Sequence, residues 1–179
     1  MRLSGLMSSI VGIWLGQPMP ALSQALPLNE RVPVRLVAVK DGDSVVVASD
    51  RYGIFEVRMA GIDAPETTKS SKMPGQPFAD ESKHNLERLT SAGMLSVSCP
   101  QARDYYARGP VCFVYGGESN LNYAQVLAGL AWVDRYSRDR KLLDAQQVAS
   151  HYRRGLWKQD SPTAPHEWRK VCWREGRCD

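Results

Sequence analysis

The sequence predicts an α+β protein in which a small β-barrel of five short strands is covered by three packed helices. Between residues 32 and 62, apolar and polar side chains alternate as they do in strands. Three later segments carry apolar residues at helical spacing, and two short apolar segments rich in valine lie between the first two of them. Five short strands with interleaved helices indicate a small barrel with helical packing.

The first three strands form a β-meander. Residues 32–38 alternate, residues 45–47 are a run of three valines, and residues 54–62 make the third strand after a turn at residues 49–53. We expect Val57 and Met59 to share one face of that third strand, with Arg58 on the other.

The remaining elements follow in order. Pro77 opens a helix of about four turns, which Gly93 ends. Strands are predicted over residues 95–99 and 111–115, joined by a polar loop, and helices over residues 120–132 and 141–152. The tail from residue 158 contains two prolines and is predicted to be irregular.

The amino terminus has the composition of a secretory leader. After Arg2 the chain carries no charge until Glu30, and the small residues before Ala25 fit a cleavage site. Removal of residues 1–25 would leave 154 of the 179 residues, which we divide into one domain at 26–157 and a tail at 158–179. We therefore expect a periplasmic or secreted protein, without stable membrane insertion and monomeric.

Composition excludes several classes of protein. A hydrophobic share of 43% and a charged share of 23% are typical of globular chains and argue against wholesale disorder. The net charge of +4 permits a polyanionic partner but is weak evidence for one.

An even count of four cysteines in an exported protein favours disulfides. If Cys99 lies opposite Cys112, their bond pins the base of the loop between them, and Cys172 then pairs with Cys178. Four cysteines allow three pairings, so this is a preference. A zinc site with His166 is the alternative, but its spacing fits no standard ligand pattern.

The tail also holds two tryptophans among basic residues, at Trp168 and Trp173. These rings could stack on nucleic acid, but we favour a tail folded onto the barrel.

Three stretches hold the residues that carry chemistry: 41–44 (DGDS), 58–66 (RMAGIDAPE) and 104–109 (DYYARG). Asp43 begins the second strand, and Asp63 follows the end of the third. With the turn near Arg51, Asp43 lies opposite residue 59 or 60, so both carboxylates project from the same edge. Glu66 follows shortly after, beyond Pro65.

This residue set suits hydrolysis of a phosphodiester. Asp43, Asp63 and a carbonyl of the turn at residues 63–64 are oxygen ligands of the kind Ca²⁺ takes, and Arg58 suits bidentate phosphate binding. A carboxylate can then position or deprotonate water. The structural alternative is that Asp-Gly-Asp is only a turn and that Arg58 pairs with Glu56. The joint occurrence at compatible spacing favours the chemical interpretation.

With these motifs, residues 32–157 resemble the staphylococcal nuclease-like (thermonuclease) family. The DGDS turn, the RMAGIDAPE segment and the DYYARG loop resemble family motifs, as do residues 77–82, 124–133 and 145–157. The resemblance implies an OB-type five-stranded barrel with three helices, and Ca²⁺-dependent cleavage of DNA and RNA.

The resemblance also implies roles for individual residues. The metal ligands would be Asp43, Asp63 and the Ala64 carbonyl, with Asp41 behind them; Glu66 would be the general base or would position water. The phosphate clamp would be Arg58 and Arg108, and Tyr106 would contact the nucleotide. The chain departs from the family at the periphery, where Ala107 replaces a glycine and where Trp132 and Asp134 replace a pair of tyrosines.

Two other classes of function are alternatives to a nuclease. A non-catalytic nucleic-acid-binding OB domain would have no chemical need for Arg58, Glu66 and Arg108 together. A structural protein that uses the barrel as a scaffold would have no affinity for nucleic acid.

Overall fold

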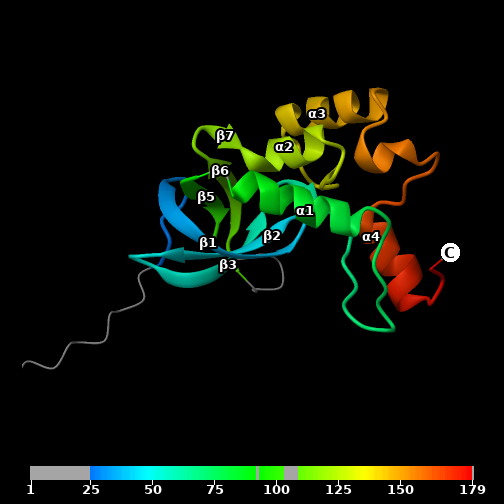
Figure 1. Ribbon diagram of the computed structural model, residues 1–179, viewed down its shortest axis with the longest axis horizontal. Coiled ribbons are helices and arrows are strands. Elements are labelled where there is room, and N and C mark those ends of the chain that lie inside the picture. Colours follow the sequence, from blue (N-terminus) through cyan, green and yellow to red (C-terminus); the bar gives the residue numbers. More distant parts are fainter. Residues whose placement is uncertain (1–24, 92, 103–108, 179) are drawn as a thin grey trace, which may run out of the picture.

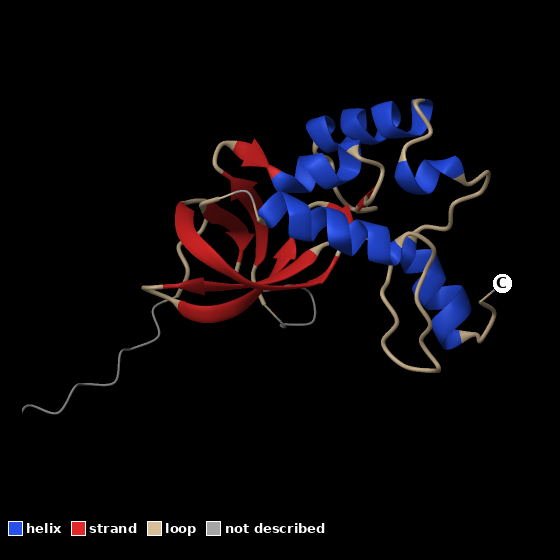
Figure 2. Ribbon diagram, viewed as in Figure 1, coloured by secondary structure: helices blue, strands red, loops and turns tan. Residues whose placement is uncertain are grey.

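The computed structural model describes residues 25–91, 93–102 and 109–178. The predicted leader therefore lies almost wholly outside the described residues. Six strands form the main sheet, in the order β3-β2-β1-β5-β6-β7, and a pairing between β3 and β6 closes it into a barrel (Figures 1 and 2). Their bounds are β1 Arg31–Asp41, β2 Ser44–Ser49, β3 Gly53–Met59, β5 Leu95–Gln101, β6 Val111–Gly116 and β7 Ser119–Asn120. The predicted α+β barrel is confirmed.

Strand β1 is long enough to pair on both sides and to bend between its partners. Residues 31–34 pair with β5, and residues 35–41 pair with β2. The register with β2 shifts at two places, after Leu36 and after Val39. Such bulges increase the local twist and let a strand curve around a small barrel. The closing pairing then joins Arg58 to Val111 and Met59 to Cys112 in parallel.

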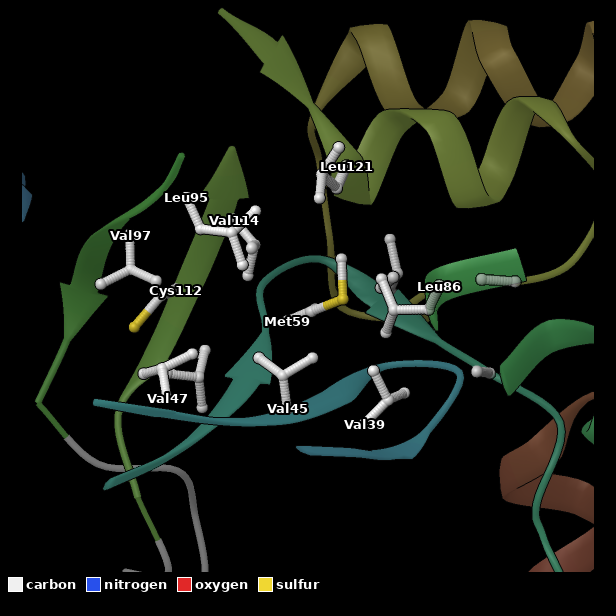
Figure 3. Packing of buried hydrophobic residues seen from close by; sticks show 14 of the residues in the cluster. Val39, Val45, Val47, Met59, Leu86, Leu95, Val97, Cys112, Val114 and Leu121 are labelled. Atoms are coloured by element: carbon white, nitrogen blue, oxygen red, sulfur yellow. The ribbon is translucent and has the colours of Figure 1, made fainter. Parts of the chain in front are cut away.

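The barrel interior is filled by valines from facing strands. Val45, Val47 and Val57 are completely buried. Met59 lies close to Val45, beneath the helices (Figure 3). Leu86 extends this core to the first helix. The interior is apolar, so the polar groups of the site must lie at its edge.

Three main helices cover the barrel: α1 Ala79–Thr90, α2 Leu121–Leu127 and α3 Arg140–His151. Helix α1 packs on β1, and α2 lies between α1 and α3 (Figure 1). Asp139 caps α3, since its side chain accepts the backbone N–H of Lys141 at 2.9 Å. These helices correspond to the three predicted from the sequence.

The predicted ends of two helices are wrong. Helix α1 begins at Ala79 rather than Pro77, because Phe78 adopts a left-handed backbone with φ 68°. Helix α2 ends at Leu127, five residues early, because Gly129 turns the chain with φ 70°. A Cβ at Gly129 would lie 2.3 Å from the Arg154 carbonyl oxygen. The chain beyond it forms strand β8, Trp132–Val133, which pairs with β4, Ile62–Asp63.

The prediction of an irregular tail is also wrong. A short 3₁₀ helix, η1 Gly155–Lys158, is followed by α4 Pro165–Trp168 and by a continuing turn of wider helix, η2 Arg169–Arg174. Pro165 suits the first turn of a helix, where its missing N–H costs nothing, so this proline opens the element instead of preventing it. Helix α4 lies beside the long loop that precedes α1 (Figure 1).

Both expected disulfides are present, Cys99–Cys112 and Cys172–Cys178. The tail cysteines are therefore bonded to each other and do not form a zinc site with His166. Trp132 packs against Trp157, with ring centroids 4.3 Å apart. In the part of the chain that the structure describes, no helix is both long and apolar enough to cross a membrane.

The contribution of the barrel disulfide to the free energy of unfolding can be tested. Replacement of Cys99 and Cys112 by alanine should lower the free energy of unfolding by about 3 kcal/mol, because the loop that it closes no longer restricts the unfolded chain. Urea unfolding measures the change. The matched control, replacement of Cys172 and Cys178, opens a shorter loop and should cost less. Equal stability of the barrel variant and the wild type would contradict the prediction.

Candidate active site

The pairing of β2 with β3 assembles the site. Ser44 lies opposite Arg58, and the Met59 N–H donates to the Asp43 carbonyl at 2.8 Å. The predicted register is thereby confirmed. The Ala64 N–H donates to Asp43 Oδ2 at 2.9 Å, which ties the turn after β3 to the start of β2.

Arg58 bridges the two aspartates. Its Nη2 lies 2.9 Å from Asp63 Oδ1, and its Nη1 lies 3.3 Å from Asp43 Oδ1. Both carboxylates are almost completely buried, whereas the arginine remains 30% exposed. Arg58 does not pair with Glu56, which binds Lys40 at 2.8 Å instead.

Burial is the main cause of the altered protonation of Asp43. Burial raises the pKa of its carboxyl to about 8, and repulsion from Asp41 and Asp63 adds to the effect, although Arg58 opposes it. Attraction to Asp43 in turn raises the pKa of Arg58, which stays charged. The two buried carboxylates are oxygen donors of the kind that a hard divalent cation takes.

Asp41 lies behind this pair. Its Oδ1 faces the Asp43 N–H at 3.4 Å, and its Oδ2 binds Lys69 Nζ at 3.1 Å. Burial acts to raise its pKa, but Lys69 and hydrogen bonds hold that pKa below the usual value. Asp41 therefore orients the turn and brings Lys69 to the rim.

The turn that presents Asp43 is held by helix α2. Gln125 is fully buried, and its Nε2 donates to the Gly42 carbonyl at 2.7 Å and to the Ser82 carbonyl at 3.0 Å. A Cβ at Gly42 would lie 1.8 Å from Ser82 Oγ and 2.8 Å from Ala64 Cβ. Only glycine fits there. Sequence reasoning missed Gln125, although a glutamine in a mostly apolar helix was a usable signal.

Glu66 lies on the loop that leads to α1. Its backbone is fixed by Gln76, whose N–H donates to the Glu66 carbonyl at 2.8 Å. Its carboxylate is 14% exposed, and burial raises its pKa, although Arg169 counteracts this. The predicted general base thus lies in the same groove as Asp63.

Arg169, which the sequence interpretation missed, belongs to this cluster. Its Nη1 and Nη2 bind Asp63 Oδ1 and Oδ2 at 3.1 and 2.9 Å, and its Nη1 also contacts Glu66 Oε1. The clustering of basic and aromatic residues in the tail was the available signal, but it did not indicate where the tail lies.

Arg108 and Tyr106, the other predicted site residues, lie outside the described residues. The ends of their loop border the groove, since Gln101 and Gly109 line it together with Asp43, Arg58 and Glu66. A Cβ at Gly109 would lie 2.6 Å from the Glu56 carbonyl, so the loop returns close against β3. The groove has a volume of about 1550 Å³. This exceeds a pocket for one small ligand and suits a polymer.

The side chains at the site supply only some of the oxygen ligands that a hard divalent cation needs. No cluster of three or more His, Cys, Asp or Glu side chains with metal-binding geometry occurs in residues 25–91, 93–102 and 109–178. Two aspartates, a backbone carbonyl and water nevertheless form an acceptable set for Ca²⁺, which readily uses carbonyl and water oxygens.

Residues 56–159 match the family model described as staphylococcal nuclease homologue, which covers more than half of the chain. The chain belongs to the staphylococcal nuclease-like family. It is 31% identical to the micrococcal nuclease of Shigella flexneri over 84% of this chain and 91% of that protein.

Two further relatives are similar to this chain over most of its length. An "uncharacterized endonuclease" of Haemophilus influenzae is 32% identical over 79% of this chain and 75% of that protein. The thermonuclease of Staphylococcus hyicus is 28% identical over 77% and 83% of the two chains. Family membership supports an endonuclease activity for the chain, that is, hydrolysis of phosphodiester bonds.

The raised pKa of Asp43 predicts a gain in stability when its charge is removed. The folded state holds this proton more tightly than the unfolded chain, so wild-type stability falls as pH rises from about 4 to about 8. In chelator at pH 9, Asp43→Asn should raise the melting temperature by at least about 2–4 °C.

The advantage of the Asn variant should vanish near pH 3, below the ordinary pKa of an aspartate, where the wild-type carboxyl is protonated in both states. Thermal unfolding followed by circular dichroism measures the melting temperatures of the wild type and the variant at each pH. A variant less stable than the wild type at pH 9 would contradict the charge argument.

Proposed function

We propose that this staphylococcal nuclease-like protein is an exported, Ca²⁺-dependent nuclease that hydrolyses phosphodiester bonds in DNA and RNA. The observation that carries the proposal is the convergence of Asp43, Asp63, Arg58 and Glu66 on one groove. Carboxylates that can hold a cation lie there beside a guanidinium for the phosphate and an acid for the water.

Asp43, Asp63 and the Ala64 carbonyl would hold the ion, which supplies positive charge beside the phosphate when bound. Arg58 binds non-bridging phosphate oxygens through its planar guanidinium and stabilises the charge that develops on them. Its 30% exposure leaves it accessible from the groove while Asp43 and Asp63 fix its orientation.

Glu66 acts on the water. Its carboxylate orients the attacking water, or takes its proton, as the water oxygen bonds to phosphorus and the bond to the leaving oxygen breaks. By resemblance, Arg108 completes the phosphate clamp and Tyr106 contacts the nucleotide. A binding module needs neither a buried acid nor an arginine shared by two aspartates, so the groove favours catalysis over binding alone.

Export is supported by the composition of residues 1–25 and by the two disulfides. Disulfides form and persist in oxidising compartments such as the periplasm and the exterior of the cell. We therefore place the protein in the periplasm or among secreted proteins, and we propose that it acts as a monomer.

Digestion of denatured DNA, with and without a Ca²⁺ chelator, tests the function. Cleavage should require Ca²⁺, and Glu66→Gln should lower kcat about 10²- to 10⁴-fold, because the variant cannot accept the proton of water. Arg108→Ala should also lower the rate strongly. Parallel digestion of RNA tests the breadth of substrate.

Glu118→Gln is the matched control, because Glu118 pairs with Arg31 on the surface, with 92% of its side chain exposed. This control should cleave at the wild-type rate. Cleavage that resists the chelator, or full activity in Glu66→Gln, would overturn the mechanism.

A further inference from the structure

The chain after the barrel domain forms a defined arm, residues 159–178, that returns to the active site. Both arm tryptophans donate their indole N–H to the Pro74 carbonyl, Trp168 at 3.2 Å and Trp173 at 2.9 Å. Gln76 donates to the Thr163 carbonyl. Buried Cys172 closes the end of the arm through Cys178. These contacts dock the arm on the loop that carries Glu66, without any contribution from Arg169.

Arg169 is the arm residue that reaches the site carboxylates. It grips Asp63 with both terminal nitrogens, at 3.1 and 2.9 Å, and also contacts Glu66. Two thirds of its side chain is covered. Of the other basic arm residues in the described chain, Lys170 and Arg174 are exposed, and Arg177 pairs with Glu175.

Hydrogen bonds already occupy most of the Asp63 carboxylate. An ionised carboxylate offers about four lone-pair positions. Arg58 and Arg169 both donate to Oδ1, and Arg169 also donates to Oδ2. A cation bound by Asp63 therefore has to share the carboxylate with Arg169 or displace it.

The positive charge of Arg169 also opposes cation binding. The guanidinium of Arg169 neutralises the acids that would attract a divalent cation, and it repels that cation at short range in a partly desolvated groove. Competition for lone pairs and electrostatic repulsion thus both oppose cation binding, and no contact of Arg169 with the described residues favours it.

We propose that Arg169 is a built-in competitor for the cation, so that the arm sets the Ca²⁺ concentration at which the site fills. This inference rests on the proposed Ca²⁺-dependent function. The ion has to draw Asp63 away from Arg169, and binding is therefore weaker than Asp43, Asp63 and the Ala64 carbonyl alone would give.

Calorimetric titration with CaCl₂ alone tests the inference without any cleavage. Arg169→Gln should bind Ca²⁺ with a Kd at least about tenfold lower than the wild type, because one competing positive charge is removed. Arg174→Gln removes the same charge from an exposed position on the same arm, and its Kd should match the wild type. Arg169→Lys keeps the charge but loses the bidentate hydrogen bonds to Asp63. Its Kd should lie between that of Arg169→Gln and that of Arg174→Gln.

Cleavage at limiting Ca²⁺ provides a second readout, in which Arg169→Gln should reach half-maximal rate at a lower Ca²⁺ concentration. Melting temperatures in chelator verify that each variant is folded. A Kd for Arg169→Gln equal to or above that of Arg174→Gln overturns the inference alone. If no variant and no wild type binds Ca²⁺, the proposed Ca²⁺ dependence fails as well.

Discussion

The ion pairs that Arg58 makes with Asp43 and Asp63 are the constraint on which the site depends. Two aspartates whose side chains are about 95% buried repel each other, and burial makes each charge costly. The arginine between them offsets that cost only because β2 and β3 place it on the strand opposite Asp43. The barrel, the helices and the long loop can be understood as the framework that holds this charged group at the edge of an apolar core.

That framework is built from different elements on each side. Gln125 of α2 holds the Gly42 turn from behind, and the Ala64 N–H closes it from the front. The loop bearing Glu66 is fixed by Gln76, and the docked arm then adds Arg169. Removal of Arg58 from this network would be costly, because both aspartates would then stay buried without the cation that they share.

Much of this arrangement could be predicted from the sequence, where local rules decide it. The turn near Arg51 sets the register of the hairpin, so Asp43 could be placed opposite residue 59 or 60, and the structure places it opposite Met59. The even cysteine count favoured disulfides, and a second predicted hairpin led us to prefer the pairing that the structure shows. Helix α2 was predicted too long because its apolar spacing continues past Gly129, whereas close approach to Arg154 imposes a turn there.

The arm could not be placed by such rules. Its position depends on contacts with residues far away in the sequence, among them the Pro74 carbonyl, which accepts hydrogen bonds from Trp168 and Trp173. Prolines that indicated an irregular tail in fact open helix α4, and only tertiary contact shows that Arg169 reaches Asp63. Local patterns therefore described the barrel and the family motifs, but they did not indicate that Arg169 lies at the site.

A crystal structure of the protein grown with Ca²⁺, with the ion located by its anomalous scattering, tests the proposed metal site most directly. We expect one ion at about 2.3–2.6 Å from oxygens of Asp43, Asp63 and the Ala64 carbonyl, with Arg58 facing the groove. An ion bound elsewhere, or a site in which both aspartates keep only their arginine partners at saturating Ca²⁺, would contradict the proposed metal site.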